Sequence, residues 1–214
     1  RDVLGSRGLG DVYKRQILGG TFDPFHKGHF MLAETAYEQF GLDEIWILPN
    51  GNPPHKREIE QTDFEIRCEM IRLATFEIPY MKLCDVESSE ECYHYTYQTI
   101  EKLKQTYPVD KFYFIIGADS LRDFPTWRKP EIIADSCILL VACRDSSGIP
   151  QLEEKIAEIR EKFGAVCFIM NSPKVDAASK EIRAMISQGK NVSKYLEKGV
   201  IDYIREQQLY IHAD

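Results

Sequence analysis

The sequence predicts an α/β fold, with a parallel sheet flanked by helices. Short apolar runs alternate along the chain with amphipathic helical patterns. Three of these runs are nearly continuous, as is typical of parallel strands buried on both faces. This alternation implies β–α–β units. A chain of 214 residues, 43% of them hydrophobic, is long enough to bury a sizeable core in one such domain.

The strands are predicted from the apolar runs. We expect a first strand of which only residues 16–18 remain before a pair of glycines. Further strands are expected at 45–48, 81–86, 111–116, 136–142 and 165–170. Ligands of parallel α/β sheets bind beyond the carboxyl ends of the strands, so functional residues are expected after these runs.

The helices are predicted from apolar residues that recur every three or four positions. One such face lies between residues 30 and 40, and Gly41 is placed to end that helix. The segment 62–65 (Thr-Asp-Phe-Glu) has capping-box spacing and predicts the start of a second helix. A third is expected from 152 to 163 before Gly164, and residues 179–210 read as two or three short helices.

The first sixteen residues differ from the rest of the chain. Gly5, Gly8 and Gly10 interrupt any periodicity, and the stretch resembles translated sequencing-adapter sequence joined to a truncated gene. We therefore expect residues 1–16 to be a non-native or disordered leader and residues 17–214 to form one domain.

Composition excludes several classes of protein. The net charge of −7 argues against sequence-independent binding of nucleic acid, which needs a basic surface. Six scattered cysteines without CxxC spacing argue against a disulfide scaffold or zinc site and are expected to be buried free thiols. The apolar runs are too short to cross a bilayer. The sequence thus predicts a cytoplasmic protein that binds neither membrane nor nucleic acid.

One motif carries the functional prediction. Residues 19–29 read Gly-Gly-Thr-Phe-Asp-Pro-Phe-His-Lys-Gly-His, between the first strand and the first helix. Glycines let a backbone approach a phosphate closely, and a helix N-terminus offers N–H groups and a positive dipole end to an anion. His26 and His29 are three residues apart, so both rings can face one ligand and donate to phosphate oxygens. A turn with two surface histidines is the alternative.

The motif resembles the signature of the nucleotidyltransferase superfamily, and most closely that of bacterial nicotinate-mononucleotide adenylyltransferases. The resemblance extends from Ile17 to the C-terminus. It includes a proline-rich loop at 46–56, Tyr-Thr at 95–96, the segment from 114 to 127 and Ser-Lys-Glu-Ile-Arg at 179–183. It implies a Rossmann-like nucleotidyltransferase fold and a transfer of the adenylyl group of ATP to nicotinate mononucleotide, with Mg²⁺ held mainly by the ATP phosphates and water rather than by a protein metal site.

The resemblance assigns the ATP-binding residues, with His26, His29 and Arg183 also in the catalytic role. The ATP-binding set is Gly19, Gly20, Thr21, Phe22, His26, His29, Asp119, Ser179 and Arg183. The guanidinium of Arg183 suits phosphate, although an exposed helix arginine is the alternative. Asp119 is expected to accept from the ATP ribose hydroxyls, and it could instead or also cap a helix.

The resemblance also assigns the mononucleotide-binding residues. Lys56 would meet the substrate phosphate or lie solvated in a loop, and Trp127 would stack on the pyridine ring or belong to the core. Thr96 would bind the nicotinate carboxylate or cap a helix. Two positions depart from the family pattern: Ala-Ala-Ser-Lys at 177–180 replaces Ile-Ser-Ser-Thr, and Arg128 replaces a tyrosine. Arg128 adds positive charge at the carboxylate if it turns inward.

Three other functions remain open at this stage. A pantetheine-phosphate or cytidylyl-type nucleotidyltransferase would share the motif, but pantetheine enzymes usually carry threonine at the position of His26. A non-catalytic nucleotide sensor would share the fold, but His26, His29 and Arg183 are all present. A nucleic-acid-binding module would need a basic stripe lined with aromatic residues, and the sequence pattern has none. The sequence leaves assembly into a homo-oligomer open.

Overall fold

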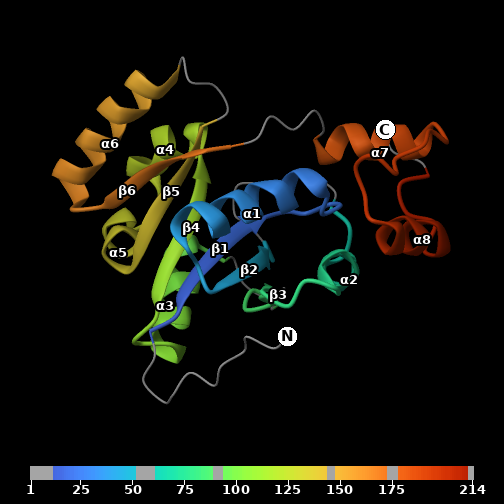
Figure 1. Cartoon of the computed structure of the whole chain (residues 1–214), viewed down its shortest axis with the longest axis horizontal. Helices are drawn as coiled ribbons and strands as arrows, with labels where there is room; N and C mark the ends of the chain where they lie inside the picture. The colour runs from blue at the N-terminus through green and yellow to red at the C-terminus, as the bar shows by residue number, and fades with distance from the viewer. Residues whose placement is uncertain (1–11, 52–60, 89–93, 144–147, 173–177, 212–214) are drawn as a thin grey trace.

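A computed structural model describes residues 12–51, 61–88, 94–143, 148–172 and 178–211. The elements alternate between strands and helices as the sequence predicts (Figure 1). In chain order they are β1 Lys14–Gly20, α1 Lys27–Phe40, β2 Glu44–Pro49, α2 Phe64–Thr75, β3 Met81–Leu83, α3 Thr96–Thr106, β4 Lys111–Gly117, α4 Ala118–Asp123, the short 3-10 helix η1 Phe124–Thr126, α5 Pro130–Ser136, β5 Cys137–Cys143, α6 Ile149–Phe163, β6 Val166–Asn171, α7 Ser179–Ser187 and α8 Lys198–Glu206.

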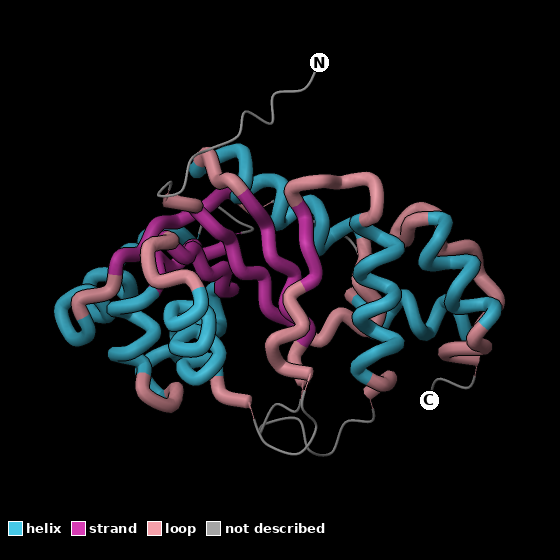
Figure 2. The backbone as a smooth tube through the Cα atoms, turned by 90° about the horizontal axis from the view of Figure 1, so that it is seen from below, coloured by secondary structure: helices cyan, strands magenta, loops and turns pink. Residues whose placement is uncertain are grey.

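The described strands form one parallel sheet of six, in the order β3-β2-β1-β4-β5-β6. Figure 2 shows this sheet in magenta with helices around it. The chain moves outward in one direction from β1 to β3 and then returns to the other side of β1 with β4. This is the doubly wound, Rossmann-like arrangement. Its topological switch point lies between β1 and β4, where such sheets bind their ligands.

Alternating residues of the central strands enter two different hydrophobic clusters. In β4, Phe112 and Phe114 pack with α3, α5 and α6, whereas Tyr113 and Ile115 pack with α1 on the opposite face. Side chains of a strand alternate between the faces of a sheet, so an unbroken apolar run buries both faces. The prediction of a parallel sheet flanked by helices is confirmed.

The C-terminal helices have a small core of their own beside α2. Met70 of α2 packs with Ile182 of α7 and with Val200 and Ile204 of α8. The three helices lie together at the end of the molecule away from α6 (Figure 1). This packing brings the end of the chain close to the first loop of the fold.

Two details of the helix predictions have different outcomes. Gly41 and Gly164 end α1 and α6 with φ of 56° and 69°, the left-handed conformation that glycine adopts at no steric cost. The capping box at 62–65 is wrong, because α2 begins at Phe64 after Asp63, whose side chain makes no cap hydrogen bond. The backbone N–H of Thr62 donates instead to the Asp23 carboxylate at 3.2 Å.

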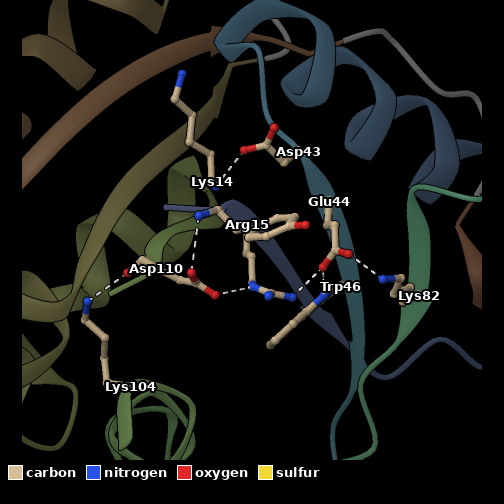
Figure 3. Close-up of polar contacts among 9 residues, drawn as sticks. Lys14, Arg15, Asp43, Glu44, Trp46, Lys82, Lys104 and Asp110 are labelled. Atoms are coloured by element: carbon tan, nitrogen blue, oxygen red, sulfur yellow. Dashed lines mark hydrogen bonds and ion pairs between the residues drawn. The ribbon is translucent and has the colours of Figure 1, made fainter. Parts of the chain in front are cut away.

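The expected boundary after residue 16 is wrong, because β1 begins at Lys14. Arg15 lies between the carboxylates of Asp110 and Glu44, with Nε 2.5 Å from the first (Figure 3). Its guanidinium also lies 4.4 Å from the centre of the Trp46 ring. A guanidinium so enclosed by carboxylates and an aromatic face ties the start of β1 to its two neighbouring strands. The local sequence gave no sign of these distant partners.

Gln16 belongs to β1, as the sequence predicts, but the burial of its amide is unexpected. Its side chain is fully buried, and neither its amide oxygen nor its amide nitrogen has a hydrogen-bond partner. It alternates with Ile17, so it lies on the face of the sheet that packs against α1. An unpartnered buried amide destabilises a fold.

No described helix is long and apolar enough to cross a membrane.

Candidate active site

The segment between β1 and α1 lies at the switch point, and a close contact fixes its first turn. Phe22 is buried and has φ of 53°, a left-handed conformation that side chains other than glycine rarely adopt. Its ring occupies the space beside Gly20, where a Cβ would lie only 2.8 Å from Phe22 Cε1. The position of the Phe22 ring therefore favours glycine at residue 20.

The two histidines of the motif lie face to face at the start of α1. The ring centres of His26 and His29 are 3.7 Å apart, with 26° between the ring planes. His26 Nδ1 accepts from the backbone N–H of Gly28 at 3.1 Å, and His29 Nδ1 accepts from the backbone N–H of His26 at 3.3 Å. Because each Nδ1 accepts, a neutral ring carries its proton on Nε2. The helix cap thus orients two Nε2–H donors side by side.

Burial keeps His26 in this neutral form. Its side chain is 7% exposed, and desolvation lowers its pKa from 6.5 to about 4. Phe25 stacks on His29 and Phe22 meets it edge-on, with ring centres 5.4 Å and 4.9 Å away. The histidine pair is therefore held by aromatic packing on one side and by backbone N–H groups on the other.

The first turn of α7 attaches to the same loop. Ser179 Oγ donates to the carbonyl of Pro24 at 3.0 Å, and Arg183 Nη1 donates to the carbonyl of Asp23 at 2.6 Å. Both residues are more than 150 positions away from the loop in sequence. The structure thus brings Arg183 together with the histidine motif, as its expected role requires. The hydroxyl of Ser179 binds the loop carbonyl.

Arg67 supports the loop from α2, and sequence reasoning missed it. Its fully buried guanidinium donates to the carbonyls of Thr21 at 2.8 Å, Asn50 at 2.9 Å and Thr62 at 2.8 Å. It therefore joins the loops after β1 and β2. The available signal was an arginine at position 67 on the face that buries Cys68 and Ile71, where an unpaired charge would be costly.

A cleft of about 630 Å³ lies where β1 and β4 end. Its size suits a small-molecule ligand. Its floor includes Gly19 and the end of β4, and its wall includes Thr96, Trp127 and Arg128. Three of the predicted mononucleotide-binding residues therefore share one cleft with a glycine of the predicted ATP-binding motif.

The wall residues resolve some of the alternatives left by the sequence. Trp127 is half-buried and packs against Phe124 at 5.5 Å between ring centres, so it belongs to the core edge and also lines the cleft. Thr96 is the first residue of α3, and the cap residue is Tyr95. Arg128 is exposed, with its guanidinium 4.6 Å from the centre of the Tyr95 ring. Arg128 therefore lies along the cleft wall.

Asp119 does not line the cleft, although its neighbours Gly117 and Ser120 do. The carboxylate of Asp119 is 92% exposed and pairs with Arg122 at 2.5 Å. Asp119 is in the first turn of α4, and the cap residue is Gly117, so the capping alternative is wrong. Lys56 lies outside the described residues. Among the described residues, no group of three or more His, Cys, Asp or Glu side chains could hold a metal ion.

Glu87 is a second residue that sequence reasoning missed. It is buried and accepts from the hydroxyl of Thr99 at 2.6 Å and from the backbone N–H of Gly51 at 3.1 Å. A Cβ at Gly51 would lie 2.2 Å from the Glu87 carbonyl oxygen, so only glycine fits there. Glu87 fixes the start of the loop after β2 against α3, beside the cleft.

A nucleotide-sized cleft and a histidine pair at the switch point of a doubly wound sheet define a nucleotide-binding enzyme. The chain belongs to the cytidylyltransferase-like family, whose model matches residues 17–185. More narrowly, its relatives are named probable nicotinate-nucleotide adenylyltransferases. That of Lachnoclostridium phytofermentans is 36% identical over 195 residues, covering 91% of this chain and 98% of the relative. That of Geobacter metallireducens is 34% identical over 210 residues, covering 92% of this chain and 97% of the relative.

Solved structures agree with the fold. Nicotinic acid mononucleotide adenylyltransferase of Plasmodium falciparum complexed with NaAD superposes with a TM-score of 0.75 over 93% of this chain and 98% of that chain. The same enzyme complexed with APC gives a TM-score of 0.73. Both are 23% identical to this chain, so this likeness establishes the fold alone.

Proposed function

We propose that this protein transfers the adenylyl group of ATP to nicotinate mononucleotide, as a step of NAD biosynthesis. An oxygen of the mononucleotide 5′-phosphate attacks the α-phosphorus of ATP. The bond from the α-phosphorus to the oxygen that bridges it to the β-phosphorus breaks, and pyrophosphate leaves with that electron pair. The products are nicotinate adenine dinucleotide and pyrophosphate. The observation that carries the proposal is the pair of stacked, backbone-oriented histidines in the segment that follows Gly19, a residue that lines one cleft with Trp127, Thr96 and Arg128.

The protein's part in this reaction is alignment and charge stabilisation. The attacking phosphate is already an anion, so no strong base is needed. His26 and His29 donate from Nε2 to the phosphate oxygens of ATP, where negative charge shifts as the bond to pyrophosphate breaks. Because His26 stays neutral, it does not repel the ring of His29, and the stacked geometry is kept.

Arg183 supplies the positive charge at the triphosphate. A guanidinium has five N–H donors, so its bond to the Asp23 carbonyl is compatible with phosphate binding. The backbone from Gly19 to Phe22 follows the phosphates closely. Ser179 acts by holding the loop, and Asp119, at the start of α4, accepts from the ribose hydroxyls.

The cleft binds the mononucleotide. Trp127 offers its exposed face to the pyridine ring, and Thr96 with the backbone N–H groups near Trp127 donates to the nicotinate carboxylate. Arg128 adds positive charge to this end of the cleft. Lys56 meets the substrate phosphate.

The cofactor that suits this reaction is Mg²⁺. Held by ATP oxygens and water, it would neutralise negative charge on the triphosphate. Nicotinate mononucleotide and ATP are the proposed partners, and the proposed location is the cytoplasm.

Pyrophosphate release from ATP tests the function. We expect release with nicotinate mononucleotide, much less with nicotinamide mononucleotide and none with 4′-phosphopantetheine or without an acceptor. Replacing ATP with CTP should abolish release. Pyrophosphate release with phosphopantetheine would identify the protein as a pantetheine-phosphate nucleotidyltransferase instead. No release with any acceptor would indicate a nucleotide sensor.

A further inference from the structure

The side chain of Asp23 links the histidine motif to the far end of the chain. Asp23 is buried, 5% exposed, between β1 and α1. Its Oδ1 accepts from the hydroxyl of Tyr210 at 2.5 Å, across 187 residues of sequence. Its Oδ2 accepts from the backbone N–H of Thr62 at 3.2 Å. Both carboxylate oxygens are thus bound, as a buried charge requires.

Tyr210 is itself fixed where it meets the loop. It follows α8, has φ of 63° and is half-buried. Its hydroxyl lies 3.5 Å from Thr62 Oγ1 and 3.8 Å from the sulfur of Met70. Burial and the neighbouring Asp23 carboxylate raise the pKa of Tyr210 above its usual value, so the hydroxyl keeps its proton and remains a donor.

The loop needs support of this kind. Phe22, directly before Asp23, has a left-handed backbone conformation that costs free energy unless the surroundings impose it. Arg67 holds the carbonyl of Thr21 and Arg183 holds that of Asp23, whereas Tyr210 holds the only charged side chain between Gly19 and His26. The direction of the chain entering α1 depends on where that carboxylate is fixed.

We propose that Tyr210 is a positioning residue that sets the histidine pair for catalysis by holding the carboxylate of Asp23. This inference rests on the proposed function. Tyr210 does not line the cleft that contains Trp127, so its hydroxyl acts through the loop. The C-terminal segment is in this way part of the active-site framework.

The first test is Tyr210→Phe, which keeps the ring and removes only the donor. We expect kcat to fall on the order of 10-fold to 10²-fold, the scale of a small misplacement of reacting groups, with the KM for mononucleotide nearly unchanged. The matched control is Tyr80→Phe. The hydroxyl of Tyr80 also donates to a carboxylate, that of Glu34 at 3.3 Å, away from the loop. Tyr80→Phe should keep the wild-type kcat.

A second readout does not depend on activity. Nitrogen NMR of the imidazole rings reports the tautomers and hydrogen bonds of His26 and His29. Tyr210→Phe should shift these resonances, and Tyr80→Phe should not. If the wild type releases no pyrophosphate, the proposed function fails, and the NMR comparison still decides the positioning role. Unchanged histidine resonances in Tyr210→Phe, together with an unchanged kcat where activity exists, would overturn the positioning role of Tyr210.

Asp23→Asn keeps the inference testable if Tyr210→Phe folds poorly. The asparagine Oδ1 still accepts from Tyr210, whereas its NH₂ group cannot accept from the Thr62 N–H. We expect it to retain more activity than Asp23→Ala, which loses both bonds. Equal activity of the two variants would count against a role for the Tyr210 contact.

Discussion

His29 Nδ1 accepts from the backbone N–H of His26, while the two rings stack with their centres 3.7 Å apart. This hydrogen bond orients the ring of His29 through the backbone of His26. The backbone N–H of Gly28 donates to His26 Nδ1, so both rings are part of the cap of α1. A helix N-terminus, which attracts anions, is therefore capped by the two side chains that we propose as donors to the ATP phosphates.

Removing the second imidazole should affect chemistry more than binding. We predict that His29→Ala lowers kcat on the order of 10²-fold or more, the usual scale for one lost transition-state donor. The KM for mononucleotide should change little, because the mononucleotide cleft is not lined by His29. Steady-state kinetics check this, with half-buried Thr35→Ala of the same helix as the control. A wild-type kcat in His29→Ala would remove the residue from the catalytic role.

The buried state of His26 predicts a pH dependence of stability. Its folded pKa of about 4 lies below the value of 6.5 expected for the unfolded chain. Between these values the unfolded state binds a proton that the folded state does not, so stability is lost as pH falls from about 6.5 toward 4. For this group alone the loss from pH 7.5 to pH 5 is about 2 kcal/mol.

Urea unfolding of the wild type and His26→Gln at both pH values measures this difference. The variant lacks the titrating group, so its stability should fall less over the same interval. Parallel losses in the two proteins would mean that His26 is protonated, or exposed, in the folded state.

The proposed binding of the mononucleotide in the cleft beside Trp127 predicts the choice of substrate. A site that offers donors to a carboxylate leaves the NH₂ of a nicotinamide amide unpaired. We predict that kcat/KM favours nicotinate over nicotinamide mononucleotide by roughly 10²-fold or more, about 2.7 kcal/mol. Arg128→Ala should reduce the preference, and the part due to backbone donors should remain.

The neighbouring Lys129 provides the control for that substitution. Its ammonium lies over the Tyr97 ring at 4.6 Å, as Arg128 lies over Tyr95, but Lys129 does not line the cleft. Lys129→Gln should leave the preference intact. Equal kcat/KM values for the two mononucleotides in the wild type would show a dual-specificity enzyme.

The unpartnered amide of Gln16 predicts a stabilising substitution. Gln16→Met keeps an unbranched side chain and removes the two polar atoms that have no partner. We expect an increase of about 1–3 kcal/mol in the free energy of unfolding, the cost of an unsatisfied buried polar group. Thermal denaturation checks this, with the exposed helix residue Gln105→Met as the control. A lower melting temperature for Gln16→Met would indicate that the amide has partners in solution.

The sequence by itself determined the features that depend on near neighbours. The alternation of apolar runs and helical faces predicted a parallel α/β sheet covered by helices, because side-chain periodicity follows from backbone geometry. The Rossmann-like arrangement was predicted from the resemblance to nucleotidyltransferases. Gly41 and Gly164 marked two helix ends. The histidine pair could also be predicted, since its hydrogen bonds join residues two and three positions apart.

Only the tertiary structure decided which distant residues support that motif. Arg67 reaches three carbonyls, Arg15 joins β1 to the carboxylates of Asp110 and Glu44, and Tyr210 binds Asp23. Each partner lies in another element, and its position follows from the packing of α2, α8 and the sheet. Spacing along the chain carries no information about such pairs, because the fold brings them together only after every intervening element has taken its place.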